Sequence, residues 1–250
     1  MKLIHKQYFN PKLMLVVFVL FSLNCLSQTK QSKVFVFTRT CGYIHESIPR
    51  GLDLISELGK GNNFTVESSD DDRIFLSDVL FGYDAIIFLS TTLDILNQEQ
   101  QKNLIKFIQM GNGFVGIHAA ADTEYDWPWY GNLVGGYFVS HPEGQPMASI
   151  HTLNKNSFFT NHLDDEWEIE DEWYNYQYTN PNINPLLNLD ESTYQGGTNG
   201  KNHPITWYHE FDGGRSFYTG LGHLEKTFED KRFKELLRKG ILYATGQIKL

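Results

Sequence analysis

Short apolar runs that alternate with helical patterns restrict the possible folds of this chain more than any other feature. Such runs occupy residues 34–37, 85–89 and 114–117, and continuous apolar character is typical of strands buried on both faces of a parallel sheet. Between them, apolar residues recur at helical spacing over residues 48–58 and 97–108. This alternation predicts an α/β fold with an open parallel sheet flanked by helices.

The ends of these helices carry their own signals. Ser47 is placed to cap the first helix, and Asn97 with Gln100 resembles a capping box at the start of the second. In the second half of the chain the pattern becomes irregular and β-rich. We expect a hairpin over residues 205–221 and a last helix over residues 230–244. No repeat or linker divides the sequence, so a single domain is predicted.

The N-terminus predicts an export signal. A basic start is followed by an apolar run over residues 13–23, too short for an ordinary membrane-spanning helix, and then by small residues. We expect residues 1–27 to be a signal peptide cleaved after Ser27, which would place the protein in the periplasm or outside the cell. Lipidation at Cys25 is the less favoured alternative. After cleavage only Cys41 remains, so no intramolecular disulfide is expected.

Charge and motifs exclude several classes of function. The net charge is −9 and no run of Lys or Arg occurs, so nucleic acid is not an expected partner. The sequence has no H-E-x-x-H, C-x-x-C, G-x-S-x-G or phosphate-loop motif in a suitable place. Aromatic residues make up 14% of the chain and suit either a thick core or a ligand cleft with stacking surfaces.

Three histidines follow predicted strands, where α/β sheets bind their ligands. His118 comes directly after a strand and before three alanines, which allow a tight elbow that would present its side chain. His45 ends the loop after the first strand. His223 lies between two glycines and Glu225, which could orient its ring. We expect the three imidazoles to share a pocket, where they could hold a divalent metal such as Zn or Mn with Asp122 nearby.

Other residues near these loops are weaker candidates. Asp171-Glu172-Trp173-Tyr174 is either a solvated turn or a sugar subsite, and Trp127 and Trp129 could add aromatic wall to the pocket. Four other histidines have no such context, and we expect them to be surface or packing residues: His141, His151, His162 and His209.

Several longer motifs carry a resemblance to a known family. They are Thr38-Arg39-Thr40-x-Gly42-Tyr43-x-His45-x-Ser47-Ile48, Phe88-Leu89-Ser90-Thr91-Thr92, Gly116-Ile117-His118-Ala119-Ala120-Ala121-Asp122-Thr123, Trp127-Pro128-Trp129-Tyr130, His141-Pro142, Asp171-Glu172-Trp173-Tyr174, His203-Pro204-Ile205-x-Trp207 and Gly214-Arg215-x-Phe217-Tyr218-Thr219-x-Leu221-Gly222-His223. Together they resemble the ThuA (trehalose utilisation) family over residues 33–246.

The resemblance implies a flavodoxin-like sheet of the class I glutamine-amidotransferase type. Amidotransferases of this class carry Cys at the elbow where this chain has His118, and their H-x-E motif is similar to His223-x-Glu225. Glutamine hydrolysis is therefore not expected. The resemblance implies a role in the use of trehalose and related disaccharides through 3-keto intermediates. Tyr43 and Arg215, which lie in the matching motifs, are expected to bind substrate.

Two hypotheses follow for function. The first is an exported carbohydrate-processing enzyme, in which His118 and His223 act as acid/base groups or metal ligands, supported by Asp122, Glu172 and Glu225. In it, Trp127, Trp129 and Trp173 stack on sugar rings, and His45 helps to bind substrate or metal. A His base with a metal Lewis acid would suffice for elimination or isomerisation next to a sugar ketone. The second is a non-catalytic sugar-binding module, which needs the aromatic wall but not the histidines.

Overall fold

Parallel strands in the first half of the chain continue into antiparallel strands in the second half. The computed structural model describes residues 30–250, in which the strands form one nine-stranded sheet and one two-stranded sheet. The predicted signal peptide lies outside these residues. The strands are β1 (Ser32–Phe37), β2 (Phe64–Ser69), β3 (Ala85–Leu89), β4 (Gly113–Ile117), β5 (Gly136–Ser140), β6 (Met147–Thr152), β7 (Glu166–Glu170), β8 (Asn175–Tyr178), β9 (Asn184–Leu189), β10 (Pro204–Phe211) and β11 (Gly214–Thr219).

The large sheet runs in the order β2-β1-β3-β4-β11-β10-β9-β6-β7. The first five strands pair in parallel, and the last four join by antiparallel pairing. The α/β fold with a β-rich second half is therefore confirmed. The predicted hairpin is β10–β11, and β11 returns to the middle of the sheet, where it pairs with β4.

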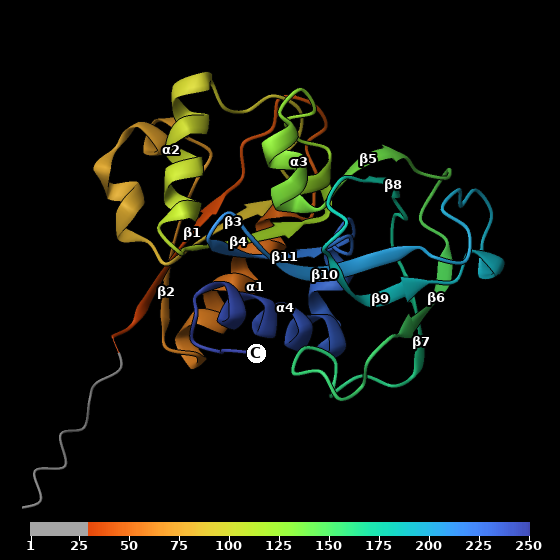
Figure 1. Cartoon of the computed structure of the whole chain (residues 1–250). Helices are drawn as coiled ribbons and strands as arrows, with labels where there is room; N and C mark the ends of the chain where they lie inside the picture. Colours follow the sequence, from red (N-terminus) through yellow and green to blue (C-terminus); the bar gives the residue numbers. More distant parts are fainter. Residues whose placement is uncertain (1–29) are drawn as a thin grey trace, which may run out of the picture. The chain divides into compact units, whose positions relative to one another are not determined.

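Helices cover both faces of the parallel part. The α-helices are α1 (Ile48–Gly61), α2 (Gln98–Gln109), α3 (Pro128–Val134) and α4 (Lys231–Ala244). Figure 1 shows α2 and α3 on one face of the sheet, and α1 and α4 on the other. Short 3₁₀ helices lie at η1 (Asp72–Leu76), η2 (Asp78–Gly82), η3 (His118–Ala121), η4 (Glu191–Thr193) and η5 (Glu225–Glu229). No helix in residues 30–250 has both the length and the apolar character needed to cross a membrane.

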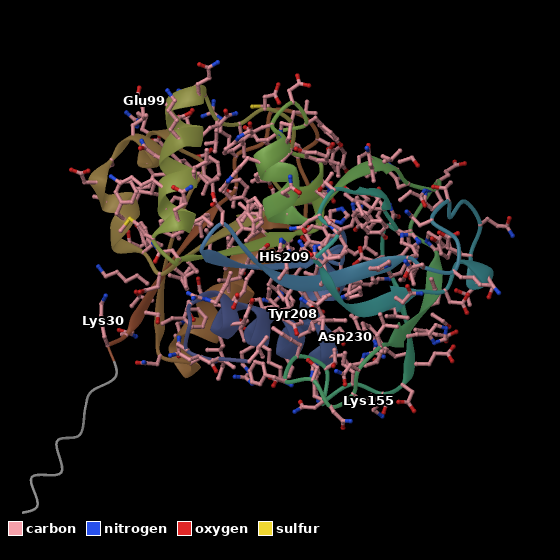
Figure 2. All side chains as sticks on the ribbon, in the orientation of Figure 1. Lys30, Glu99, Lys155, Tyr208, His209 and Asp230 are labelled. Atoms are coloured by element: carbon pink, nitrogen blue, oxygen red, sulfur yellow. The ribbon has the colours of Figure 1, made fainter. Side chains whose placement is uncertain are left out.

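Because helices cover both faces of the sheet, the sequences of its parallel strands are continuous apolar runs. All five residues of β3 are fully buried, as are the phenylalanines of its neighbours, Phe37 and Phe114. Side chains of adjacent residues on β10 likewise enter opposite layers: His209 bonds to Asn132 of α3, whereas Tyr208 packs on Tyr243 of α4 (Figure 2).

The two helix starts differ from each other. Asn97 and Gln100 form the predicted capping box, with each side chain bonded to the backbone N–H of the other. Ser47 occupies the N-cap position of α1, but its side chain makes no cap bond. Its hydroxyl donates instead to the carbonyl of Gly222 at 2.8 Å. The predicted cap is thus replaced by a tertiary bond that joins the start of α1 to the loop carrying His223.

Candidate functional site

His118 stands at the elbow between β4 and η3, fully buried and with a positive φ of 51°. A non-glycine residue in this region is strained, and such strain is concentrated at functional sites. The three alanines after it are also fully buried, and their small side chains allow the tight turn. The Nδ1 of His118 donates to the carbonyl of Gly220 at 2.8 Å, so Nε2 is the ring nitrogen that faces the neighbouring side chains.

His45 and His223 meet His118 from two other loops. The ring centroids of His45 and His118 are 4.8 Å apart, and each lies 5.2 Å from the ring of His223. His223 follows Gly222, whose φ of +123° suits glycine. The predicted convergence of the three imidazoles is therefore present, because the loops after parallel strands open at the same edge.

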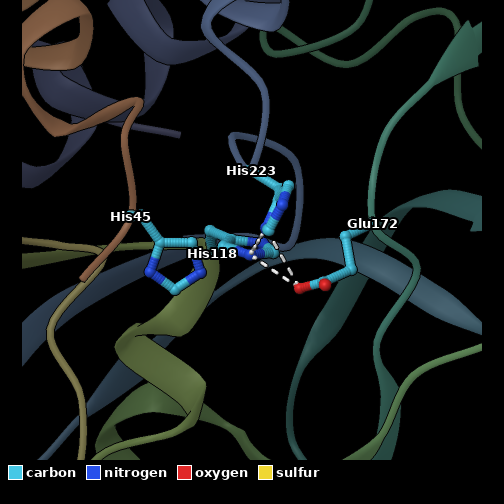
Figure 3. Close-up of side chains that lie close together, drawn as sticks. All are labelled: His45, His118, Glu172 and His223. Atoms are coloured by element: carbon cyan, nitrogen blue, oxygen red, sulfur yellow. Dashed lines mark hydrogen bonds and ion pairs between the residues drawn. The ribbon is translucent and has the colours of Figure 1, made fainter. Parts of the chain in front are cut away.

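Glu172 supplies a carboxylate to the same cluster. Its Oε2 lies 3.3 Å from Nε2 of His118 and 3.1 Å from Nδ1 of His223, and these two nitrogens are 3.3 Å apart. Figure 3 shows the carboxylate pointing at His118 and His223, with the ring of His45 on the far side. One ligand atom from each of His45, His118, Glu172 and His223 lies within 4.8 Å of all the others.

Burial and neighbouring charges shift the pKa values of these groups in different directions. Burial, aided by His118 and His223, lowers the pKa of His45 to about 2, so this ring stays neutral. Burial tends to raise the pKa of Glu172, but hydrogen bonds from His118 and His223 outweigh it and hold the pKa below its ordinary value. Burial likewise opposes the charged form of His223, yet the Glu172 carboxylate keeps the pKa of His223 above its usual range. Burial raises the pKa of Asp122.

The cluster fits a divalent metal ion. Three imidazoles and a carboxylate are a ligand set that zinc and manganese accept. His118 meets a further requirement, because a ligating histidine usually donates its other ring N–H to a backbone carbonyl or a carboxylate. Within residues 30–250, the buried Nδ1 of His45 has no hydrogen-bond partner, so packing alone does not account for this side chain.

A pocket of about 300 Å³ opens beside the cluster. Its walls carry both ligating and aromatic side chains: Tyr43, His45, Asp122, Phe138, His141, Gln145, Glu172, Tyr174 and His223. A second cavity of about 340 Å³ shares Tyr43 and His223 with it and extends along Glu46, Glu170 and Glu225. A larger cavity of about 630 Å³ lies elsewhere, around Arg215 and the last residues of the chain. We place the site by the ligand cluster and not by cavity size.

The structure does not bring all predicted residues to this pocket. The Trp173 ring is 1% exposed and donates to the carbonyl of Pro146, so it is closed to a sugar. Trp127 lines a different cavity, and Trp129 bonds to Asp212. Trp127 and Trp129 follow the elbow in sequence, but they lie at the start of α3 and away from the pocket.

Arg215 and Glu225 are also placed differently from the sequence prediction. Arg215 pairs with Gly113 at the start of β4, the opposite end of the strand from His118, and donates to the carbonyls of Tyr243 and Ala244. It therefore stabilises the end of α4. Glu225 lies in the second cavity and has no bond to His223 within residues 30–250. The carboxylate that contacts the His223 ring is Glu172.

His141 is a site residue that sequence reasoning missed. We expected a surface or packing role, but its Nδ1 lies 3.4 Å from Oε1 of Glu172 and its side chain lines the pocket. The one signal available was its place in a motif, His141-Pro142, that resembles the family. Gln145 and Phe138 also line the pocket and carried no signal of their own, whereas Tyr174 belongs to the motif Asp171-Glu172-Trp173-Tyr174.

The fold and the site together define an α/β protein with a histidine–carboxylate pocket at the carboxyl edge of its parallel strands. The sequence matches the ThuA family, described as trehalose utilisation, over residues 33–244, so the chain belongs to this family. A comparison with curated proteins gives no match.

Solved structures support the same fold. A ThuA-like protein from Bacteroides uniformis shares 20% identity and a TM-score of 0.72, covering 86% of this chain and 91% of its own. A ThuA-like protein from Parabacteroides merdae shares 19% identity and a TM-score of 0.71, covering 88% and 92%. A β-galactosidase from Bacillus circulans sp. alkalophilus matches 87% of this chain with 31% of its own, at 14% identity and a TM-score of 0.56. At these identities the likeness shows the fold.

Proposed function

We propose that this protein is an exported, metal-dependent enzyme that processes trehalose-like disaccharides or their 3-keto derivatives. The observation that carries the proposal is the convergence of His45, His118, Glu172 and His223 within 4.8 Å beside an open pocket. These four residues would hold the ion. The carbohydrate substrate is drawn from the family's description, trehalose utilisation.

The protonation preferences suggest a division of roles. When bound, a divalent ion supplies a Lewis acid that polarises a sugar carbonyl. A ketone acidifies the neighbouring C–H, and a group of the pocket must take that proton while another returns one to the substrate. Glu172, with its lowered pKa, stays a carboxylate and cannot donate a proton. Asp122 and His141 line the same pocket and are the groups we propose for proton transfer.

The shape of the site supports a substrate with two rings. Each of the two cavities is at the small end of the range for ligand pockets, about 300–1,000 Å³, and they adjoin at Tyr43 and His223. We propose that the reacting ring occupies the cavity beside the histidines and that the second ring lies beyond Tyr43. The pocket has aromatic side chains from Tyr43, Phe138 and Tyr174 to contact sugar faces.

The rival function, a sugar-binding module, draws less support from the site. Of its predicted tryptophan wall, Trp173 is buried and Trp127 lines another cavity, and the aromatic residues that do line the pocket serve an enzyme equally well. Three imidazoles around one carboxylate are suited to metal binding or acid/base catalysis, and a sugar-binding module needs neither.

The test is metal analysis combined with turnover. Elemental analysis of the purified protein should find a bound transition metal, and 3-keto-trehalose should be consumed at a rate that falls on treatment with a chelator and returns with Mn²⁺ or Zn²⁺. Protein that binds neither metal and leaves 3-keto-trehalose and trehalose unchanged would contradict the proposal. Binding of trehalose without turnover would favour the sugar-binding module.

A further inference from the structure

Asp171 is a fully buried carboxylate next to the cluster. It follows the end of β7 directly, one residue before Glu172. Its oxygens accept four hydrogen bonds from within residues 30–250. Oδ1 accepts from the backbone N–H of Glu172 at 2.9 Å and of His223 at 3.0 Å, and Oδ2 accepts from the N–H of Gly222 and the hydroxyl of Thr227, each at 2.9 Å.

These bonds join the two chain segments that carry Glu172 and His223. One oxygen of Asp171 holds the backbone of both residues, so the same atom sets the position from which each side chain starts. The second oxygen fixes the turn at Gly222 and the helix η5 through Thr227. Gly222 is held from the other side as well, because its carbonyl accepts the hydroxyl of Ser47.

The topology explains why such a link is needed. β7 is the last strand at one end of the large sheet, whereas His223 follows β11 in its middle. Glu172 reaches the cluster only because the chain turns back across the sheet after β7. The next residues of this segment bind the β-rich half: the Trp173 ring donates to Pro146, and Tyr174 accepts from His203. Asp171 binds the same segment to the loop after β11.

We propose that Asp171 is a positioning residue that aligns Glu172 and His223 for metal binding. This inference rests on the proposed metal site. Partners of metal ligands at this distance typically change metal affinity by roughly 10–100-fold when they are removed.

The experiment measures binding of Mn²⁺ alone to the metal-free protein, by calorimetry and by electron paramagnetic resonance. In Asp171→Asn an amide N–H replaces one acceptor and faces backbone or hydroxyl donors. We expect Mn²⁺ binding to weaken by roughly 10–100-fold and the resonance spectrum to change. The matched control is Asp84→Asn, the same substitution at a carboxylate that also accepts a backbone N–H, that of Lys33, outside the site. Its Mn²⁺ affinity should equal that of the unmodified protein.

Near-ultraviolet circular dichroism of each metal-free variant separates positioning from folding. A purely structural role would lower the melting temperature of Asp171→Asn but leave its Mn²⁺ affinity unchanged, and that result would overturn the inference. If Asp171→Asn does not fold, Thr227→Val decides, because it removes one donor to Oδ2 and touches neither ligand. Weaker Mn²⁺ binding in Thr227→Val supports the inference, and unchanged binding overturns it. An unmodified protein that binds no Mn²⁺ or Zn²⁺ would overturn the metal site itself.

Discussion

The Nδ1–H of His118 donates to the backbone carbonyl of Gly220 at 2.8 Å, across 102 positions of sequence. This bond fixes the tautomer of the ring and turns Nε2 toward Glu172 and His223. It also ties the elbow after β4 to the loop after β11, the two neighbouring strands that supply the centre of the site.

His118→Asn should remove metal and activity while keeping the fold. Asparagine tolerates the positive φ at this elbow better than most residues, so the backbone can stay in place. We expect the variant to lose bound metal on elemental analysis and to lose at least about 100-fold in turnover of 3-keto-trehalose. His151→Asn is the control, because that side chain is exposed and pairs with Asp190 away from the pocket. Full metal content in His118→Asn would contradict its role as a ligand.

Tyr43→Ala should change substrate preference with little effect on stability. The side chain is 62% exposed, so truncation should alter the free energy of unfolding by no more than about 0.5 kcal/mol. Because Tyr43 lines both cavities, KM should rise more for the 3-keto disaccharide than for a 3-keto monosaccharide. Tyr43→Phe keeps the ring and should behave nearly as the unmodified protein. An equal rise in KM for both substrates would argue against two subsites.

The protein should release no ammonia from glutamine. The elbow position that holds the nucleophilic cysteine in amidotransferases is occupied by His118, and Cys41 lies exposed in the loop after β1. A coupled ammonia assay should therefore give the background rate, and Cys41→Ser should not change it. Glutaminase activity that disappears in Cys41→Ser would show that this cysteine is a nucleophile.

Stability should fall in acid partly through His209, which is 1% exposed on β10. Burial lowers its pKa from 6.5 to about 4, outweighing the hydrogen bond to Asn132. Between pH 6.5 and about 4 the unfolded chain therefore binds a proton at His209 that the folded chain does not. The folded state has its full stability with respect to His209 above pH 6.5 and loses stability as the pH falls toward 4. We expect a loss of about 3 kcal/mol from this residue.

Urea unfolding at pH 8 and pH 4 measures this contribution in the difference between the unmodified protein and His209→Gln, whose side chain does not titrate. The glutamine variant should lose less stability between the two pH values. Parallel losses in the two proteins would show that His209 does not titrate differently on folding.

The mature protein should begin at Gln28 when it is made in its native host. The basic start, short apolar run and small residues predict cleavage after Ser27. Intact-mass measurement of the purified protein checks this directly. A mass that begins at Met1 would argue against export through a cleaved signal, and a mass with a lipid on Cys25 would establish the alternative anchor.

Local sequence determined the strands, helices and one helix cap, because their signals lie within a few residues of each other. The apolar runs of β1, β3 and β4 predicted burial on both faces, and Asn97 with Gln100 predicted a capping box that the structure contains. The sequence also predicted that His45, His118 and His223 meet, since parallel topology sends the ends of successive strands to one edge.

Tertiary structure decided which of the other candidate residues join them. Glu172 and Asp171 reach the cluster because the chain turns back from β7, at one end of the sheet, and His141 follows β5 of the small second sheet; no local pattern encodes either path. The family motifs predicted Arg215 and Trp173 as site residues, yet Arg215 lies at the opposite end of β11 and Trp173 is buried. Strand direction and side-chain burial are set by contacts between distant segments. For this reason the sequence named Asp122, Glu172 and Tyr43 as candidates, but only the tertiary structure placed Glu172 against His118 and His223.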